Sequence, residues 1–248
     1  MPKIVAIGGG ELRNLDTLLI DKEIVKLTGK KHPRALFIPT GSGDSEGYWQ
    51  TFQKVYGKKL GCRTDVLYLV KENPSRREID EKIFSSDLIY VGGGNTLRLL
   101  KKWREKGMDE ILKKAYEKNI VLSGLSAGAI CWFNYGTSDS IKYKRHPKKL
   151  VKLECLGLID AVLSPHHIRE PHRKTELIKV MKRTSGVGIA LDDNCAMEII
   201  DGKYRMICSR KNAGAHRCYY LKGRLHYELI KIKKGFEPLT ELIKPKPF

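Results

Sequence analysis

Apolar runs that end in glycine alternate with helix-like segments through the first half of the chain, and this alternation limits the folds open to it. The runs KIVAIGGG, RALFIPTG and DLIYVGGG each join aliphatic residues to a turn, as buried strands do. Strands that alternate with helices predict a mostly parallel sheet covered on both faces, and so an α/β fold. Helices are expected at residues 15–27, 48–60, 75–84, 96–106 and 108–118, with a further strand at 65–70.

Two of these helices carry end signals in the sequence. Ser75, with Glu78 three residues later, has the pattern of a capping box, and Gly107 is a C-terminal cap glycine. Beyond Leu156 the pattern changes to strands at residues 157–167 and 188–200, a helix at 170–184 and short antiparallel strands from Lys203 onward. No linker or internal repeat divides the chain, which predicts a single α/β domain over residues 1–248.

Three glycine-rich loops follow strand-like runs, at residues 8–10, 92–94 and 124–128. In a parallel sheet these loops fall at the carboxyl ends of strands, where ligands bind. The first loop does not complete G-x-G-x-x-G, and no G-x-x-x-x-G-K-[ST] is present, so nucleotide binding is not favoured. We expect such loops to offer backbone N–H groups to a developing oxyanion.

The third loop has the form G-x-S-x-G in the segment VLSGLSAGAICWF, residues 121–133. An apolar strand, a tight turn and a helix packed back on the strand would hold the Ser126 hydroxyl above the sheet edge. The N–H of Ala127 would then point to where an oxyanion forms. A small-residue turn with a capping serine is the plainer interpretation of the five residues taken alone.

A serine nucleophile needs a base, and the base needs an orienting acid. The segment SPHH ends an apolar run and offers His166 or His167 as the base. Asp139 lies between two serines in GTSDS, where an Asx turn is an equally good interpretation. The other acid candidates are Asp160, Glu170 and Asp192.

Composition and charge further narrow the class of protein and its expected partners. The chain has 47 basic and 28 acidic residues among 248, a net charge of +19, with a basic peak at residues 141–152. Aromatic residues do not alternate with the basic ones as in nucleic-acid modules, so a nucleic-acid partner is not favoured. No apolar stretch is long enough for a bilayer, and the N-terminus lacks signal-peptide features, which predicts a cytoplasmic protein without a membrane partner. The six scattered cysteines are expected as reduced thiols.

The chain resembles the peptidase E family of serine peptidases, which includes aspartyl dipeptidases and, more distantly, cyanophycinases. The resemblance covers most of the sequence and lies in IVAIGGGEL, IYVGGGNTLRLL, GLSAGAICWF, GTSDS, LSPHH and GIALDDNCAMEI. It implies a flavodoxin-like, three-layer fold similar to class I glutamine amidotransferases. Those relatives use cysteine at the turn and a His-x-Glu pair, whereas this chain has Ser126 and no Glu two residues after either histidine.

Carried over to this sequence, the resemblance implies Ser126 as the nucleophile, His166 as the base and Asp139 as the orienting acid. The N–H groups of Gly93 and Ala127 would form the oxyanion hole, and no metal or cofactor is implied. On these grounds we expect Ser126 and His166 to lie about 3 Å apart, with Asp139 on the far side of the ring.

The resemblance also implies a short peptide substrate with an N-terminal aspartate. Arg169 and Arg173 could pair with its carboxylate, and Glu11 and Glu170 with its amine. The basic stretch 141–152 lies between Asp139 and His166, and is expected to rim the site. A homodimer is compatible with this interpretation.

Two alternatives remain open at this point. An esterase of the α/β-hydrolase type shares G-x-S-x-G and the order Ser, Asp, His, but usually places its histidine nearer the C-terminus. A basic binding protein without activity, built on a peptidase scaffold, would account for the net charge of +19.

Overall fold

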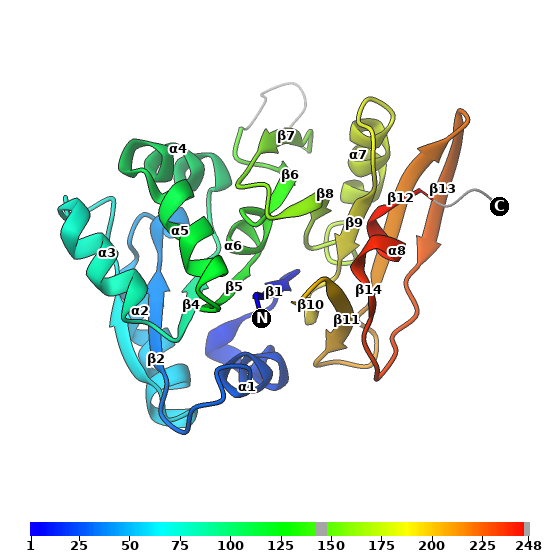
Figure 1. Cartoon of the computed structure of the whole chain (residues 1–248). Helices are drawn as coiled ribbons and strands as arrows, with labels where there is room; N and C mark the ends of the chain where they lie inside the picture. The colour runs from blue at the N-terminus through cyan, green and yellow to red at the C-terminus, as the bar shows by residue number, and fades with distance from the viewer. Residues whose placement is uncertain (142–147, 246–248) are drawn as a thin grey trace.

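The computed structural model describes residues 1–141 and 148–245, and it is built on two β-sheets (Figure 1). The larger sheet has eight strands in the order β14-β11-β10-β1-β5-β4-β2-β3. Its parallel part supports the expected α/β class, and its other edge is antiparallel. The strands are β1 (Lys3–Ile7), β2 (Arg34–Ile38), β3 (Arg63–Val66), β4 (Leu88–Val91), β5 (Val121–Leu125), β10 (Cys195–Ile200), β11 (Lys203–Cys208) and β14 (Glu237–Pro238).

The second sheet has six strands in the order β13-β12-β9-β8-β6-β7. Its centre is parallel, because β8 pairs in parallel with β6 and with β9, and both edges are antiparallel. The strands are β6 (Phe133–Ser138), β7 (Val151–Glu154), β8 (Ile159–Ser164), β9 (Gly188–Leu191), β12 (Ala215–Leu221) and β13 (Arg224–Leu229). The expected short antiparallel strands near the C-terminus are therefore present, divided between the two sheets.

Helical segments cover both faces of the larger sheet (Figure 1). On one side, Val5 and Ile7 of β1 share a buried core with the aromatic residues of α2 and η3. On the other side, Ile4 and Ala6 belong to a core that also includes α3, α4, α5 and residues of the second sheet. The helices are η1 (Leu12–Asn14), α1 (Leu18–Lys26), η2 (Thr40–Ser42), α2 (Glu46–Phe52), the π-helix η3 (Gln53–Lys59), α3 (Arg76–Phe84), α4 (Thr96–Lys106), α5 (Met108–Glu117), α6 (Ala127–Ile130), α7 (His172–Met181) and α8 (Leu239–Ile243).

This alternation of core residues follows from the pleat of β1, whose successive side chains point to opposite faces of the sheet. Both cores are filled by aliphatic and aromatic side chains with almost no exposure. Within the described ranges, no helix combines the length and the apolarity that a membrane crossing requires.

Helix ends follow the signals in the sequence more closely than strand lengths do. The capping box at Ser75 and Glu78 is formed, and Gly107 ends α4 with φ 63°. The strand expected at residues 65–70 ends at Val66, and the helix expected at 48–60 continues as a π-helix from Gln53. The run 188–200, expected as one strand, is two strands in different sheets, because residues 192–194 turn between them and Asn194 adopts φ 66°.

Replacing Ser75 with alanine is expected to lower the free energy of unfolding by about 1 kcal/mol, because the N–H of Glu78 loses its acceptor. The control is Ser85→Ala at the other end of α3, where the hydroxyl makes only an exposed 3.4 Å bond to the carbonyl of Lys82. Urea unfolding measures both variants. Equal midpoints for Ser75→Ala and Ser85→Ala would contradict a stabilising cap.

Candidate active site

Ser126 lies on the sharp turn between β5 and α6, as the G-x-S-x-G pattern predicts. Its backbone has φ 55° and ψ −112°, a strained conformation for a residue with a side chain. The turn is held because the Ser126 N–H donates to the Ile7 carbonyl at 3.0 Å, and the Ser126 carbonyl accepts from Ala129 and Ile130 at 2.9 Å each. The hydroxyl is thereby fixed at the carboxyl edge of the larger sheet.

Gly128 lets α6 lie directly against β4. A Cβ atom at this position would lie 2.1 Å from the carbonyl oxygen of Val91, far inside contact distance. The short helix therefore approaches the sheet closely because the glycine has no side chain.

Gly128→Ala is expected to destabilise the fold by about 1–3 kcal/mol, because backbone rather than a flexible side chain must move. Gly47→Ala is the matched control, since its Cβ would meet nothing within 4 Å and it lies inside a helix. That change is expected to be neutral or stabilising by up to about 1 kcal/mol. The midpoint of thermal unfolding is measured for both variants. An unchanged midpoint in Gly128→Ala would contradict the close approach of Gly128 to the Val91 carbonyl.

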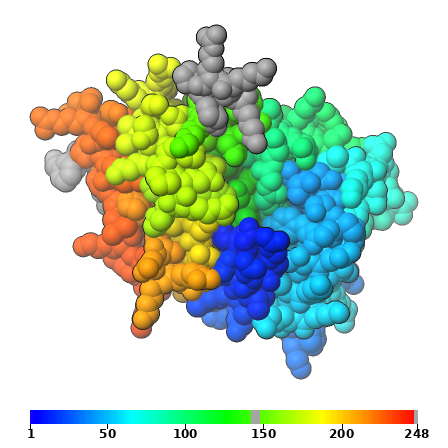
Figure 2. All heavy atoms as spheres, turned by 180° about the vertical axis from the view of Figure 1, so that it is seen from behind, coloured from blue at the N-terminus to red at the C-terminus, as the bar shows by residue number. Residues whose placement is uncertain are grey.

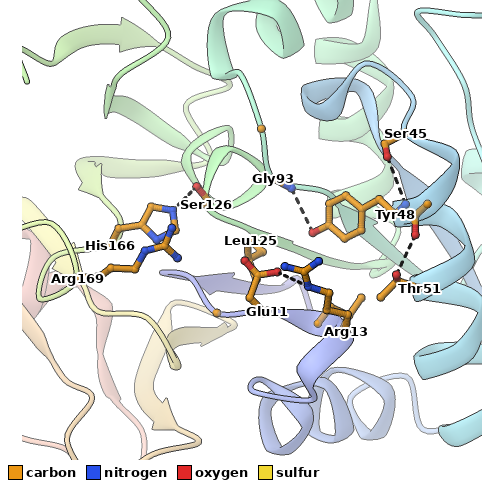
Figure 3. A pocket seen from close by; sticks show the side chains of 14 residues that line it. Glu11, Arg13, Ser45, Tyr48, Thr51, Gly93, Leu125, Ser126, His166 and Arg169 are labelled. Carbon is orange, nitrogen blue, oxygen red and sulfur yellow. Dashed lines mark hydrogen bonds and ion pairs between the residues drawn. The ribbon is translucent and has the colours of Figure 1, made fainter. Parts of the chain in front are cut away.

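His166 follows β8 and also has φ 55°. Its N–H donates to the Gly8 carbonyl at 3.2 Å, which ties the loop to the end of β1. The ring Nε2 lies 2.7 Å from the Ser126 Oγ, close to the expected separation (Figure 3).

Asp193 holds the other nitrogen of the ring. Its Oδ1 lies 2.5 Å from the His166 Nδ1, and its Oδ2 accepts from Arg169 at 3.2 Å. Burial by itself would raise the pKa of this carboxyl, but the hydrogen bond from His166 and the charge of Arg169 hold the pKa below its ordinary value. An ionised Asp193 accepts from Nδ1–H, which leaves Nε2 free to accept the Ser126 proton.

The backbone of Gly9 lies directly beneath this contact. A Cβ atom on Gly9 would be 1.8 Å from the Asp193 Oδ1 and 2.4 Å from the His166 Nδ1. The Gly9 carbonyl also accepts the N–H of Asn194 at 2.9 Å. The first glycine loop therefore supports the histidine and the aspartate with its bare backbone.

The structure does not place Asp139 at the ring, contrary to our expectation. Asp139 is exposed beyond the end of β6, and both nitrogens of His166 already have partners in Ser126 and Asp193. The signal for Asp193 was the Asp-Asp-Asn cluster between two apolar runs, which is turn chemistry at a strand end.

The remaining acid candidates have other partners. Asp160 accepts from the side chain of Asn134, and the Glu170 Oε2 lies 2.6 Å from Arg173. Asp192 accepts the N–H groups of Ile168 and Gly214 at 3.1 and 2.7 Å, so it braces the loop instead of touching the ring.

His167 points away from Ser126 into a buried cluster. Its Nε2 is hydrogen-bonded to the hydroxyl of Tyr227, and its ring lies near that of His216. Burial, and to a lesser extent His216 and Lys174, lower the pKa of His167 to about 4, so the ring is neutral at neutral pH. This neutral ring links the His166 loop to β13.

A cavity of about 560 Å³ opens beside Ser126 (Figure 3). Helix α2 forms one wall with Tyr48 and Thr51, and His166 with Arg169 forms the opposite wall. Glu11 also lines the cavity, 3.6 Å from the side chain of Arg13. In Figure 2 the contributing parts of the chain, dark blue, light blue and yellow-green, meet on one face of the molecule. Arg13, which the sequence had not singled out, adds a cation to the cavity.

Gly93 lies at this cavity beside the serine. A Cβ atom on Gly93 would lie 3.6 Å from the Cβ of Ser126, and its N–H donates to the Tyr48 hydroxyl at 3.4 Å. Burial raises the pKa of Tyr48 to about 12, so the phenol stays neutral. Ala127, the first residue of α6, is buried directly after Ser126.

The other expected substrate residues lie elsewhere. Glu170 and Arg173 are ion-paired with each other, and Arg173 is 3% exposed, so its charge is already balanced within the fold. Of the basic stretch 141–152, Lys149 and Lys152 line a second cavity of about 570 Å³ together with α7, and residues 142–147 lie outside the described ranges. The described part of this stretch therefore does not line the Ser126 cavity.

A three-layer α/β fold with a serine on a strand-to-helix turn and a histidine at its hydroxyl is the arrangement of serine-dependent hydrolases. Similarity to known proteins identifies the family of hydrolases. The family model "Peptidase family S51" matches residues 4–207. "Uncharacterized peptidase YgaJ" of Bacillus subtilis (strain 168) is 36% identical over 220 residues, 88% of this chain and 92% of that protein. "Peptidase E" of Streptomyces coelicolor is 27% identical over 136 residues, 54% of this chain and 51% of that protein.

Two solved structures share the fold at 20% sequence identity. A peptidase from an acI-B1 Actinobacterium superposes with a TM-score of 0.73 over 96% of this chain and 97% of its own. A putative peptidase E protein from Listeria monocytogenes EGD-e gives a TM-score of 0.63 over 84% of this chain and 98% of its own.

The chain belongs to peptidase family S51, the peptidase E family, and is a serine peptidase. The resemblance and the flavodoxin-like fold expected from the sequence are thereby confirmed. An esterase of the α/β-hydrolase fold is excluded by the same matches.

Proposed function

We propose that this protein is a serine exopeptidase that hydrolyses short peptides, a dipeptidase preferring an N-terminal aspartate. The observation that carries the proposal is the continuous hydrogen-bond chain from Ser126 through His166 to Asp193, which opens onto the 560 Å³ cavity. Asp193 takes the place that the sequence had assigned to Asp139.

The geometry supports an acyl-enzyme mechanism. The Ser126 Oγ attacks the scissile carbonyl while His166 Nε2 takes its proton, and Asp193 stabilises the imidazolium that forms. His166 then gives the proton to the leaving amine, and the acyl group remains on Ser126. Water attacks the acyl-enzyme with His166 again as base, which releases the N-terminal residue as a free acid and regenerates the serine.

The oxyanion of each tetrahedral intermediate would be held by the N–H groups of Ala127 and Gly93. The N–H of Gly93 now makes a long 3.4 Å bond to the Tyr48 hydroxyl, which an anionic oxygen can replace. Charge-assisted hydrogen bonds are shorter and stronger than neutral ones, so this exchange favours the intermediate over the resting site.

Asp193→Asn is expected to lower kcat by about 10³- to 10⁴-fold, because the amide favours the wrong tautomer of His166. Asp139→Asn is the matched control and is expected to keep the parent rate, since Asp139 is exposed away from the ring. The kcat of dipeptide hydrolysis is measured for both variants and for the parent protein. A large loss in Asp139→Asn with an active Asp193→Asn would restore the assignment of Asp139.

A fluorophosphonate probe tests the nucleophile independently of substrate choice. Labelling is expected at Ser126 and absent in Ser126→Ala. If the native protein neither takes up the probe nor hydrolyses any peptide, the remaining alternative, a basic binding protein without activity, is favoured.

The charges around the cavity suit a small zwitterionic acid. Arg13 and Arg169 offer guanidinium groups for an aspartate side chain or main-chain carboxylate, and Glu11 offers a carboxylate for the free amine. Arg169 already pairs with Asp193, so we assign the side-chain carboxylate of the substrate to Arg13. In the structure Glu11 lies 3.6 Å from Arg13, and the substrate amine would replace Arg13 as the partner of the Glu11 carboxylate.

Arg13→Gln is expected to lower kcat/KM for Asp-Leu by at least about tenfold and to leave Ala-Leu unchanged, because one charged partner of the substrate is lost. Arg77→Gln on α3, which pairs with Glu81 outside the cavity, is the control for net charge. The assay compares Asp-Leu, Asn-Leu and Ala-Leu in the parent and both variants. Equal rates for the three dipeptides in the parent would remove the acidic preference and leave the serine peptidase intact.

A further inference from the structure

Cys195 and Cys208 face each other across the pair β10 and β11. They are directly opposite in the antiparallel register, and their Sγ atoms are 3.0 Å apart. The neighbouring Ser209 N–H donates to the Asn194 carbonyl at 2.8 Å, which makes the cysteines a non-hydrogen-bonded pair. Such pairs have Cα atoms about 4.5 Å apart, inside the range that a disulfide spans.

The two thiols differ in access and in acidity. Cys195 is fully buried, and the hydrogen bond with Cys208 together with burial raises the pKa of its thiol well above the ordinary value. Cys208 is half-buried, and the hydrogen bond to Cys195 lowers its pKa. Because Cys195 is fully buried and Cys208 is partly exposed, Cys208 is the thiol that an oxidant reaches first.

We propose that Cys195 and Cys208 form a site of reversible oxidation, in which a peroxide converts the two thiols into a cross-strand disulfide. The Cys208 thiolate attacks one peroxide oxygen, the O–O bond breaks, and a sulfenic acid and hydroxide result. The Cys195 sulfur then attacks the sulfenic sulfur, the S–S bond forms and the S–O bond breaks. The proton of Cys195 leaves with the departing hydroxide as water. In sum, two thiols are oxidised, one hydrogen peroxide is reduced to two waters, and a dithiol reductant reverses the reaction.

The position of this pair links it to the turn that carries Asp193. Cys195 comes two residues later, its N–H donates to the Asp192 carbonyl at 3.3 Å, and its carbonyl accepts the Gly8 N–H at 2.8 Å. Forming the disulfide would bring the two sulfur atoms from 3.0 Å to a bond length of about 2.05 Å. The disulfide would therefore lie directly beside the turn that carries Asp193.

The test exposes the reduced, folded full-length protein to equimolar hydrogen peroxide, blocks the remaining thiols with N-ethylmaleimide and digests with trypsin without reduction. Cleavage after Lys203 and Arg205 separates the two cysteines, so a disulfide joins the peptide 184–203 to the peptide 206–210. This linked pair is expected as the main oxidised product, and it should disappear after dithiothreitol.

Cys208→Ser and Cys195→Ser are each expected to abolish the linked peptide, whereas Cys218→Ser, a buried thiol on β12, should leave it unchanged. Circular dichroism on each variant confirms that the fold is kept. Both peptides recovered only as maleimide adducts would overturn the proposal. So would recovery of Cys208 as a sulfinic acid with Cys195 still alkylated.

Discussion

The hydrogen-bond chain depends on the bare backbone of Gly8 and Gly9 at the end of β1. The Gly8 carbonyl holds the N–H of His166, the Gly9 carbonyl holds the N–H of Asn194, and no side chain could stand where Gly9 lies. Residues from β5, β8 and the turn after β9 meet only because this loop lets them approach. The first glycine loop, whose sequence did not fit phosphate binding, thus serves as the support on which the three polar side chains are assembled.

Two consecutive histidines have opposite environments, because the φ of 55° at His166 turns the chain sharply between them. His166 lies between a hydroxyl and an ionised carboxylate, which fixes its tautomer. His167 lies among Tyr227, His216 and cations, where burial keeps it neutral. One ring can therefore exchange a proton with Ser126, while the other only anchors the loop.

Much of the fold and half of the site were predictable from local sequence. The Ser126 turn and the capping box at Ser75 are set by residues a few positions apart, and the structure has both. Asp193 was missed because the run 188–200 was expected to form one continuous strand, although the Asp-Asp-Asn cluster inside it is typical of a turn. The role of Asp193 depends on β9 and β10 belonging to different sheets. Which sheet each strand joins is set by long-range strand pairing, which no local sequence pattern encodes.

The Ser126–His166–Asp193 chain crosses the junction between the two sheets. Ser126 ends a strand of the larger sheet, His166 follows a strand of the smaller one, and Asp193 lies on the turn that passes from the smaller to the larger. Contacts of 2.5 and 2.7 Å tolerate little sliding of one sheet against the other. The site therefore depends on the alignment of the two sheets. A small shift of one sheet along the other would separate Ser126, His166 and Asp193 even if the apolar cores stayed buried.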